Sequence, residues 1–178
     1  MKAFVSGLAL CLLAVPATSE AQQAQNPVSS ALRTLAQRFQ GNLVGAAQEM
    51  PAGKYGFKPT PQQMSFGQLV LHVAGSNDYM CSTISGEQAP TSQKLQPTDS
   101  KEKLMSRLQD SFTFCDRALA KVSDATLGEE VPFFGGQKVS RAAAMLALAE
   151  DWGDHYSAAA IYLRLNGLLP PTARQRGE

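Results

Sequence analysis

Four stretches of the chain place apolar residues at alternating steps of three and four, the spacing that is typical of amphipathic helices. The first stretch follows Asn26-Pro27, where Asn favours a helix cap and Pro fits the first helical turn, and the predicted helix runs to about Met50. Its apolar positions are Val28, Leu32, Leu35, Phe39, Leu43 and Ala46. Residues 51–61 contain Pro, Gly and Lys without periodicity and are therefore predicted to form a loop.

The second predicted helix opens with a capping box, in which Ser65 and Gln68 stand three residues apart. Gly86 is expected to end this helix, because glycine is favoured just after the last helical turn. The apolar face consists of Phe66, Leu69, Val70, Val73, Met80 and Ile84. Residues 87–98 are polar, contain Pro and are predicted to form a loop.

Asp99 and Glu102 form another candidate capping box, which is expected to open the third helix. Its apolar positions are Leu104, Leu108, Phe112, Cys115, Leu119 and Val122. Residues 123–138 then contain Pro132 and a Gly-Gly pair, so they are predicted to be a second long connection.

The fourth predicted helix starts at Ser140 and ends at Gly167, and Pro170-Pro171 prevent its continuation. Its apolar stripe consists of Met145, Leu148, Ala149, Trp152, Tyr156, Ala159 and Leu163. Four amphipathic helices in a chain of this size predict an all-α fold, a four-helix bundle. The connection over 87–98 is long enough to return along the bundle, so we expect the second and third helices to be parallel.

The N-terminus carries the pattern of a secretory signal. Lys2 precedes an apolar stretch over residues 3–15, which is too short to span a bilayer comfortably, and small residues follow Pro16. We predict cleavage between Ala21 and Gln22, with a cut after Ser19 as the second choice, so that residues 1–21 are the signal peptide and 22–178 form a single domain. An exported protein, periplasmic or secreted, is therefore expected, with no membrane association after cleavage.

The cysteines bear on both the compartment and the topology. Cys11 leaves with the predicted signal peptide, which makes Cys81 and Cys115 the remaining pair. In an oxidising compartment these two can form a disulfide, and two buried free thiols are the alternative. Parallel helices place the two cysteines at one height, whereas antiparallel helices separate them by about 15 Å, beyond the reach of a disulfide.

Composition and charge restrict the function further. The chain has 178 residues, of which 44% are hydrophobic and 17% charged, enough for one core. Lys and Arg number 16 against 15 Asp and Glu, so the net charge of +1 offers no basic surface for nucleic acid or an anionic membrane.

Histidine is scarce and its placement suggests a metal site. His72 lies at the border of the apolar face of the second helix, and Asp151 and His155 lie four residues apart at the border of the fourth. Two imidazoles and a carboxylate that converge from two helices suit a divalent transition metal with open positions for water. The alternative is that these side chains are ordinary surface or hydrogen-bonded residues at helix borders.

The segments 50–60 (MPAGKYGFKPT) and 64–74 (MSFGQLVLHVA), together with His155-Tyr156 and residues 162–167 (YLRLNG), resemble the DinB-like family of metalloenzymes. The resemblance implies an up-down-down-up four-helix bundle and a divalent ion, commonly zinc or nickel, held by one His of the second helix and a His-x-x-x-His pair of the fourth. His72 and His155 match this pattern, whereas Asp151 stands where the family has His. A carboxylate still binds zinc, manganese or iron.

Two functions remain open at this point. The first is a metal-dependent enzyme, a hydrolase or transferase that acts on an unidentified small molecule. The second is a non-catalytic bundle that binds a small ligand or a protein partner between its helices. A homodimer is compatible with both. The family includes thiol-dependent transferases and isomerases, but an exported location argues against a cytoplasmic thiol as cosubstrate.

Overall fold

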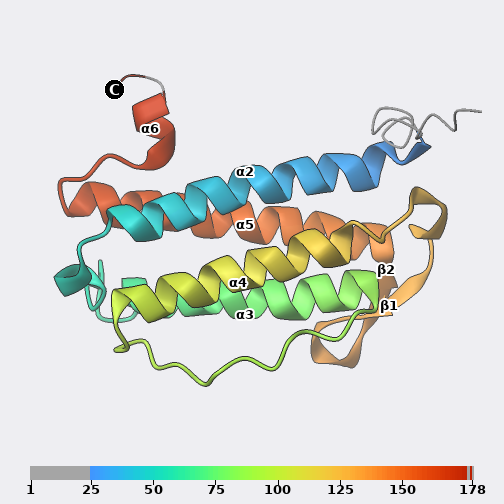
Figure 1. Ribbon diagram of the computed structural model, residues 1–178, viewed down its shortest axis with the longest axis horizontal. Coiled ribbons are helices and arrows are strands. Elements are labelled where there is room, and N and C mark those ends of the chain that lie inside the picture. The colour runs from blue at the N-terminus through green and yellow to red at the C-terminus, as the bar shows by residue number, and fades with distance from the viewer. Residues whose placement is uncertain (1–24, 176, 178) are drawn as a thin grey trace, which may run out of the picture.

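The computed structural model describes residues 25–175 and residue 177 of the chain. Four long helices lie side by side in one bundle, as Figure 1 shows. They are α2 (Pro27–Glu49), α3 (Phe66–Ser85), α4 (Lys101–Leu119) and α5 (Arg141–Leu165). The predicted signal peptide and its cleavage site lie outside the described residues. Within the described part of the chain, no helix is both long and apolar enough to cross a membrane.

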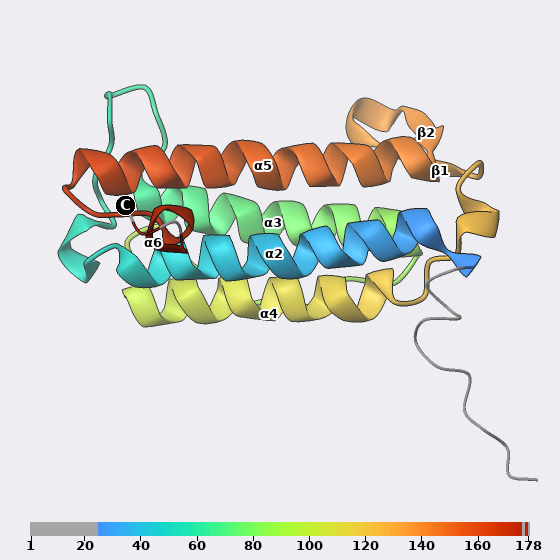
Figure 2. The same cartoon turned by 90° about the horizontal axis from the view of Figure 1, so that it is seen from above.

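The helices run up-down-down-up, which confirms the predicted topology. Figures 1 and 2 show α3 and α4 running in one direction and α2 and α5 in the other. Contacts between α3 and α4 keep a constant offset, because Asn77 meets Ser111 and Cys81 meets Cys115, both pairs 34 residues apart. A constant offset requires parallel helices. The crossover over residues 86–100 therefore returns along the whole bundle (Figure 1).

One apolar core fills the space between the four helices. The largest side chains that are fully buried in it are Trp152, Phe66, Phe112, Phe114, Met50, Ile84, Leu104, Leu108, Leu119, Leu148, Leu163 and Val73. Asn77 is an exception, a polar residue with no exposed surface on the inner face of α3. Its amide donates to Ser111 Oγ at 2.9 Å and accepts from the indole of Trp152 at 2.7 Å. Its side chain therefore joins α3, α4 and α5.

The observed helix caps match the predicted ones at α3 and differ from the prediction at α4. At α3 both hydrogen bonds of the Ser65–Gln68 capping box are present, and Gly86 ends the helix with φ of 77°. At α4 the N-cap is Ser100, and the prediction of Asp99 at this position is wrong. The Asp99 carboxylate instead accepts a hydrogen bond from the Gln96 backbone at 2.6 Å, which closes the turn before the helix.

A distant loop caps α2. The Asn26 side chain does not cap the helix that it precedes, because it accepts hydrogen bonds from Ser123 and from the Asp124 backbone. The Asp124 carboxylate accepts the free backbone N–H groups of Val28 and Ser29, each at 2.8 Å. Desolvation raises the pKa of Asp124, but these hydrogen bonds outweigh it and lower the pKa. The segment after α4 is thereby attached to the start of α2.

The connection between α4 and α5 contains structure that periodicity did not predict. A hairpin forms from β1 (Glu130–Pro132) and β2 (Lys138–Ser140), which pair antiparallel with Val131 opposite Val139. Its turn needs Gly135 and Gly136, whose φ values are 66° and 74°. Arg141 ties this connection to the bundle by donating to the backbone oxygens of Thr126 and Ile84.

The C-terminal residues also form a helix, α6 (Pro171–Gln175). α5 ends at Leu165, two residues before the predicted stop at Gly167, whose φ of 72° lies in the turn that follows. Pro171 then fits the first turn of α6. Gly45 allows this helix to approach α2, since a Cβ there would lie 3.0 Å from the Pro171 ring. The Tyr156 hydroxyl accepts from the Thr172 backbone at 3.1 Å and fixes α6 against α5.

A disulfide joins Cys81 and Cys115. The sequence was compatible with this bridge or with two free thiols, and the structure contains the bridge. Their Cα atoms are 5.2 Å apart, and neither residue has exposed surface. The bridge closes a loop that spans the entire crossover. It therefore holds the two parallel helices together at the end where the crossover begins.

We predict that the double variant Cys81→Ser/Cys115→Ser loses about 3–4 kcal/mol of unfolding free energy, because the bridge restricts the unfolded chain over this loop. Urea denaturation of the oxidised parent and the variant measures the difference. The single variants are controls and should lose a similar amount. Two free thiols in the denatured, unreduced parent would contradict the bridge.

Candidate metal centre

The structure brings the three predicted ligand residues together. His72 extends from α3, and Asp151 and His155 extend from successive turns of α5. One nitrogen of each imidazole and one carboxylate oxygen all lie within 4.8 Å of one another. The centroids of the two imidazole rings are 4.7 Å apart, with the ring planes at 73°. Both imidazoles are therefore close enough to share one ion.

Buried packing next to the cluster explains this convergence. Trp152 follows Asp151 directly, and its indole is hydrogen-bonded to Asn77. His72 lies five residues before Asn77, and His155 lies three residues after Trp152. Because α3 and α5 are antiparallel, both steps lead toward the same end of the bundle. The contact between Asn77 and Trp152 therefore sets the height at which the two histidines meet.

Burial differs across the cluster. His72 is exposed, whereas the side chains of Asp151 and His155 retain 26% and 15% of their accessible surface. Two polar atoms, Asp151 Oδ2 and His155 Nε2, are buried and have no hydrogen-bond partner among the residues that the structure describes. Buried polar atoms in native proteins nearly always have a partner, so this carboxylate oxygen and this imidazole nitrogen fit the role of metal ligands.

Two carboxylates surround His155. Its Nε2 lies 3.3 Å from Asp151 Oδ1, and its Nδ1 lies 3.5 Å from Asp154 Oδ2. The interaction with Asp151 raises the pKa of His155, burial opposes the shift, and Asp154 adds to it. Asp154 is the weaker influence because its side chain is 78% exposed and water screens its charge.

The donor set fits a divalent ion. Two imidazole nitrogens and one carboxylate oxygen form a common three-ligand set for zinc, in which an open position remains. Ligand atoms on one zinc ion lie at most about 4.2 Å apart, since each bond is about 2.1 Å. The observed limit of 4.8 Å is slightly wider, and rotation of the exposed His72 side chain can close the difference. The two unpaired atoms would then each gain a partner.

Sequence reasoning found the ligands but missed the residue that aligns them. Asn77 stands four residues after Val73 and three before Met80, both of which belong to the predicted apolar face. A polar residue in a core position is a detectable signal, because it needs a buried partner. The sequence does not reveal that the partner is Trp152, since the two residues are 75 positions apart.

The chain is similar to proteins of one superfamily. A sequence model of the DinB superfamily matches residues 35–159. Among solved structures, a DinB-like protein from Bacillus subtilis has a TM-score of 0.64 at 19% identity, covering 77% of this chain and 92% of that one. A conserved protein from Enterococcus faecalis gives 0.62 at 15% identity, covering 76% and 94%. No curated protein matches the chain.

A mutant of a mycothiol-dependent maleylpyruvate isomerase shares the fold as well. Its TM-score is 0.60 at 15% identity, and the match covers 72% of this chain and 59% of the isomerase. At such identities the likeness shows a common fold alone.

We predict that Asp151→Asn lowers the pKa of His155 in the metal-free protein, because it removes the carboxylate that contributes most to the raised value. Asp154→Asn is the matched control and should lower this pKa less. Titration of the imidazole resonances by NMR measures both changes. An equal effect of the two substitutions would contradict the assigned cause.

Proposed function

Since the chain belongs to the DinB superfamily, we propose that His72, Asp151 and His155 bind one divalent metal ion and that the protein is a metal-dependent hydrolase or transferase of a small molecule. Members of this superfamily commonly bind divalent metals. One observation supports the proposal most directly: three ligand atoms from two helices converge within 4.8 Å, and two buried polar atoms among them are unpaired.

The donor types guide the choice of metal. We propose zinc or nickel first, as in the family resemblance, with manganese and iron as alternatives that the carboxylate of Asp151 favours. Asp151 also changes the charge of the site, because the family pattern has a neutral imidazole at this position. A carboxylate partly neutralises a divalent ion and should increase the preference for harder metals.

The protein groups have distinct roles in this proposal. The three ligands would hold the ion at the border between α3 and α5, where the exposed His72 side chain gives access to solvent. A bound divalent ion supplies Lewis acidity to a substrate oxygen or to water. Asp154 Oδ2 lies 3.5 Å from His155 Nδ1, and this contact would help to keep Nε2 of the ring available as a ligand.

An enzyme is favoured over a purely structural site for two reasons. Structural zinc sites in proteins are closed by four protein ligands, whereas this cluster offers three. In addition, one protein with the same fold is an isomerase. Its dependence on mycothiol is not part of the proposal, because the likeness concerns the fold.

We predict that the purified protein binds one divalent ion per chain and that Asp151→Ala and His155→Ala weaken this binding by more than about a hundredfold. Removal of a residue that is hydrogen-bonded to a metal ligand already lowers metal affinity 10- to 100-fold, and removal of the ligand itself lowers it more. Titration calorimetry with Zn²⁺ and Ni²⁺, together with elemental analysis, measures affinity and stoichiometry.

Glu150→Ala is the matched control, because Glu150 is an exposed acid on the same helix and lies outside the cluster. Its metal affinity should equal that of the parent. Unchanged thermal stability on addition of a chelator, with no ion in the purified protein, would instead support a non-catalytic bundle.

We further propose that the protein is exported, which the disulfide between Cys81 and Cys115 supports because such bridges persist in oxidising compartments. N-terminal sequencing of the protein recovered from its native host should then begin at Gln22. A mature chain that retains Met1 or Lys2 would contradict export by cleavage.

A further inference from the structure

We propose that a groove along the outer side of α3 is the substrate site of the candidate metal centre, and that it accepts small molecules with a metal-binding polar group and a neutral aromatic ring about 10 Å away. This inference rests on the proposed function. It adds the chemical class of the substrate, which neither the metal ligands nor the fold specifies.

The groove runs along α3 and comes within one helical turn of His72 at Gly75. It has a volume of about 740 Å³, within the range of ligand sites in proteins. Its lining starts at Gly75, three residues after His72 on α3, and continues past Tyr79 and Ser82 toward Pro132 of the hairpin. The crossover forms the opposite wall through Gln88. A molecule bound to the ion can therefore extend along the groove without leaving the surface of α3.

An exposed pair of aromatic side chains lies farther along the groove from His72. Tyr79 of α3 and Phe134 of the hairpin turn have ring centroids 4.5 Å apart, and their rings are tilted by 32°. The two residues remain 37% and 54% exposed, so neither is needed to complete the core. Tyr79 lines the groove, and Phe134 packs on its ring. Such exposed aromatic side chains are typical of ligand sites, because a planar ring can stack on them.

The spacing sets the length of the ligand. Tyr79 lies seven residues after His72, which is nearly two helical turns, so both side chains leave α3 on the same side. The rise over seven residues is about 10.5 Å. A metal-bound group beside His72 and a ring beside Tyr79 must therefore be joined by a short chain of a few atoms.

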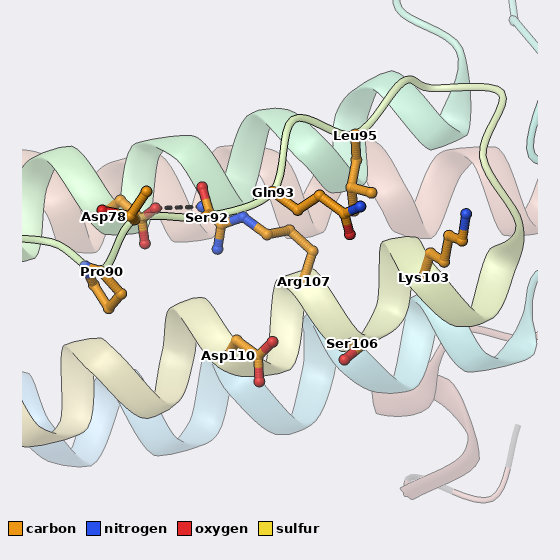
Figure 3. Close-up of a pocket in the computed structure, with 10 residues that line it drawn as sticks. Asp78, Pro90, Ser92, Gln93, Leu95, Lys103, Ser106, Arg107 and Asp110 are labelled. Atoms are coloured by element: carbon orange, nitrogen blue, oxygen red, sulfur yellow. Dashed lines mark hydrogen bonds and ion pairs between the residues drawn. The ribbon is translucent and has the colours of Figure 1, made fainter.

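The charges in the groove favour a neutral tail. Asp78 and Arg107 both line it, but they form an ion pair with each other, and their side chains are only 17% and 13% exposed. Figure 3 shows this pair beneath the crossover, with the Arg107 side chain reaching from α4 toward Asp78. Arg107 also donates to the Ala74 backbone oxygen at 3.3 Å. Because the pair is already satisfied, it does not demand a charged group on the ligand.

Gly75 is the residue of the groove that lies nearest to His72 along α3. A glycine inside a helix lowers helix stability, and the fold does not require one here, since a Cβ would meet no atom within 4 Å. The open space lies on the ligand side of α3. A large side chain at this position should therefore block the groove while the bundle stays intact.

The test compares two probes on the protein loaded with one equivalent of Zn²⁺. Acetohydroxamic acid binds the metal without a tail, and 4-phenylbutanohydroxamic acid adds a phenyl ring at a similar distance to that from His72 to Tyr79. We expect the phenyl probe to bind the parent about tenfold more tightly, as stacking and burial of one ring predict. Tyr79→Ala, Phe134→Ala and Gly75→Leu should each remove most of this gain and leave the affinity for acetohydroxamic acid unchanged.

Leu146→Ala is the control, because Leu146 is an apolar residue of α5 with 72% exposure that does not line the groove. It should keep the full gain of the phenyl probe. Retained Zn²⁺ binding and helical circular dichroism verify that each variant is folded. The substrate site alone is overturned if the parent binds the phenyl probe no more tightly than acetohydroxamic acid. It is also overturned if Tyr79→Ala and Phe134→Ala keep the higher affinity for the phenyl probe. Failure of the parent to bind Zn²⁺ or Ni²⁺ overturns the proposed function and this inference together.

Discussion

The buried side chain of Asn77 determines how three of the four helices are placed. It accepts the Trp152 indole N–H and donates to Ser111, and none of these three residues has exposed surface. A vertical shift of α5 against α3 would leave the indole and the amide unpaired inside the core, which costs about 1–3 kcal/mol for each group. Apolar contacts alone tolerate such shifts more easily because they have no direction. The hydrogen bonds therefore fix the register on which the candidate metal centre depends.

The pairing of Asp151 with His155 depends on spacing within α5 and not on the register between helices. The two residues lie one turn apart, and Asp151 Oδ1 is 3.3 Å from His155 Nε2. The carboxylate therefore stabilises the protonated imidazole in the metal-free protein. The raised pKa of His155 has a defined consequence for the metal-free protein: this pair contributes stability below the ordinary pKa of histidine, and the contribution is lost as pH rises through the raised value.

Sequence patterns predicted most of the fold because the helices obey local rules. The capping box at Ser65, the glycine stop at Gly86 and the apolar periodicity each depend on residues within one or two turns. The exceptions are caps and turns with distant partners. Asp124 caps α2 from nearly a hundred residues away, and the hairpin after α4 is too short to show periodicity. The ligands of the candidate metal centre were predicted from their helical borders, whereas Asn77, Tyr79 and Phe134 were not.

By itself, the sequence determined the four helices, the parallel course of α3 and α4 and the identity of three potential ligands, because each follows from spacing along one chain segment. Only the tertiary structure decided that His72 meets Asp151 and His155, that Cys81 reaches Cys115 and that Tyr79, which lines a groove along α3, packs on Phe134 of the hairpin turn. These features require side chains from different helices at one height. That height is set by directional contacts in the core between residues far apart in the chain, and no local pattern encodes it.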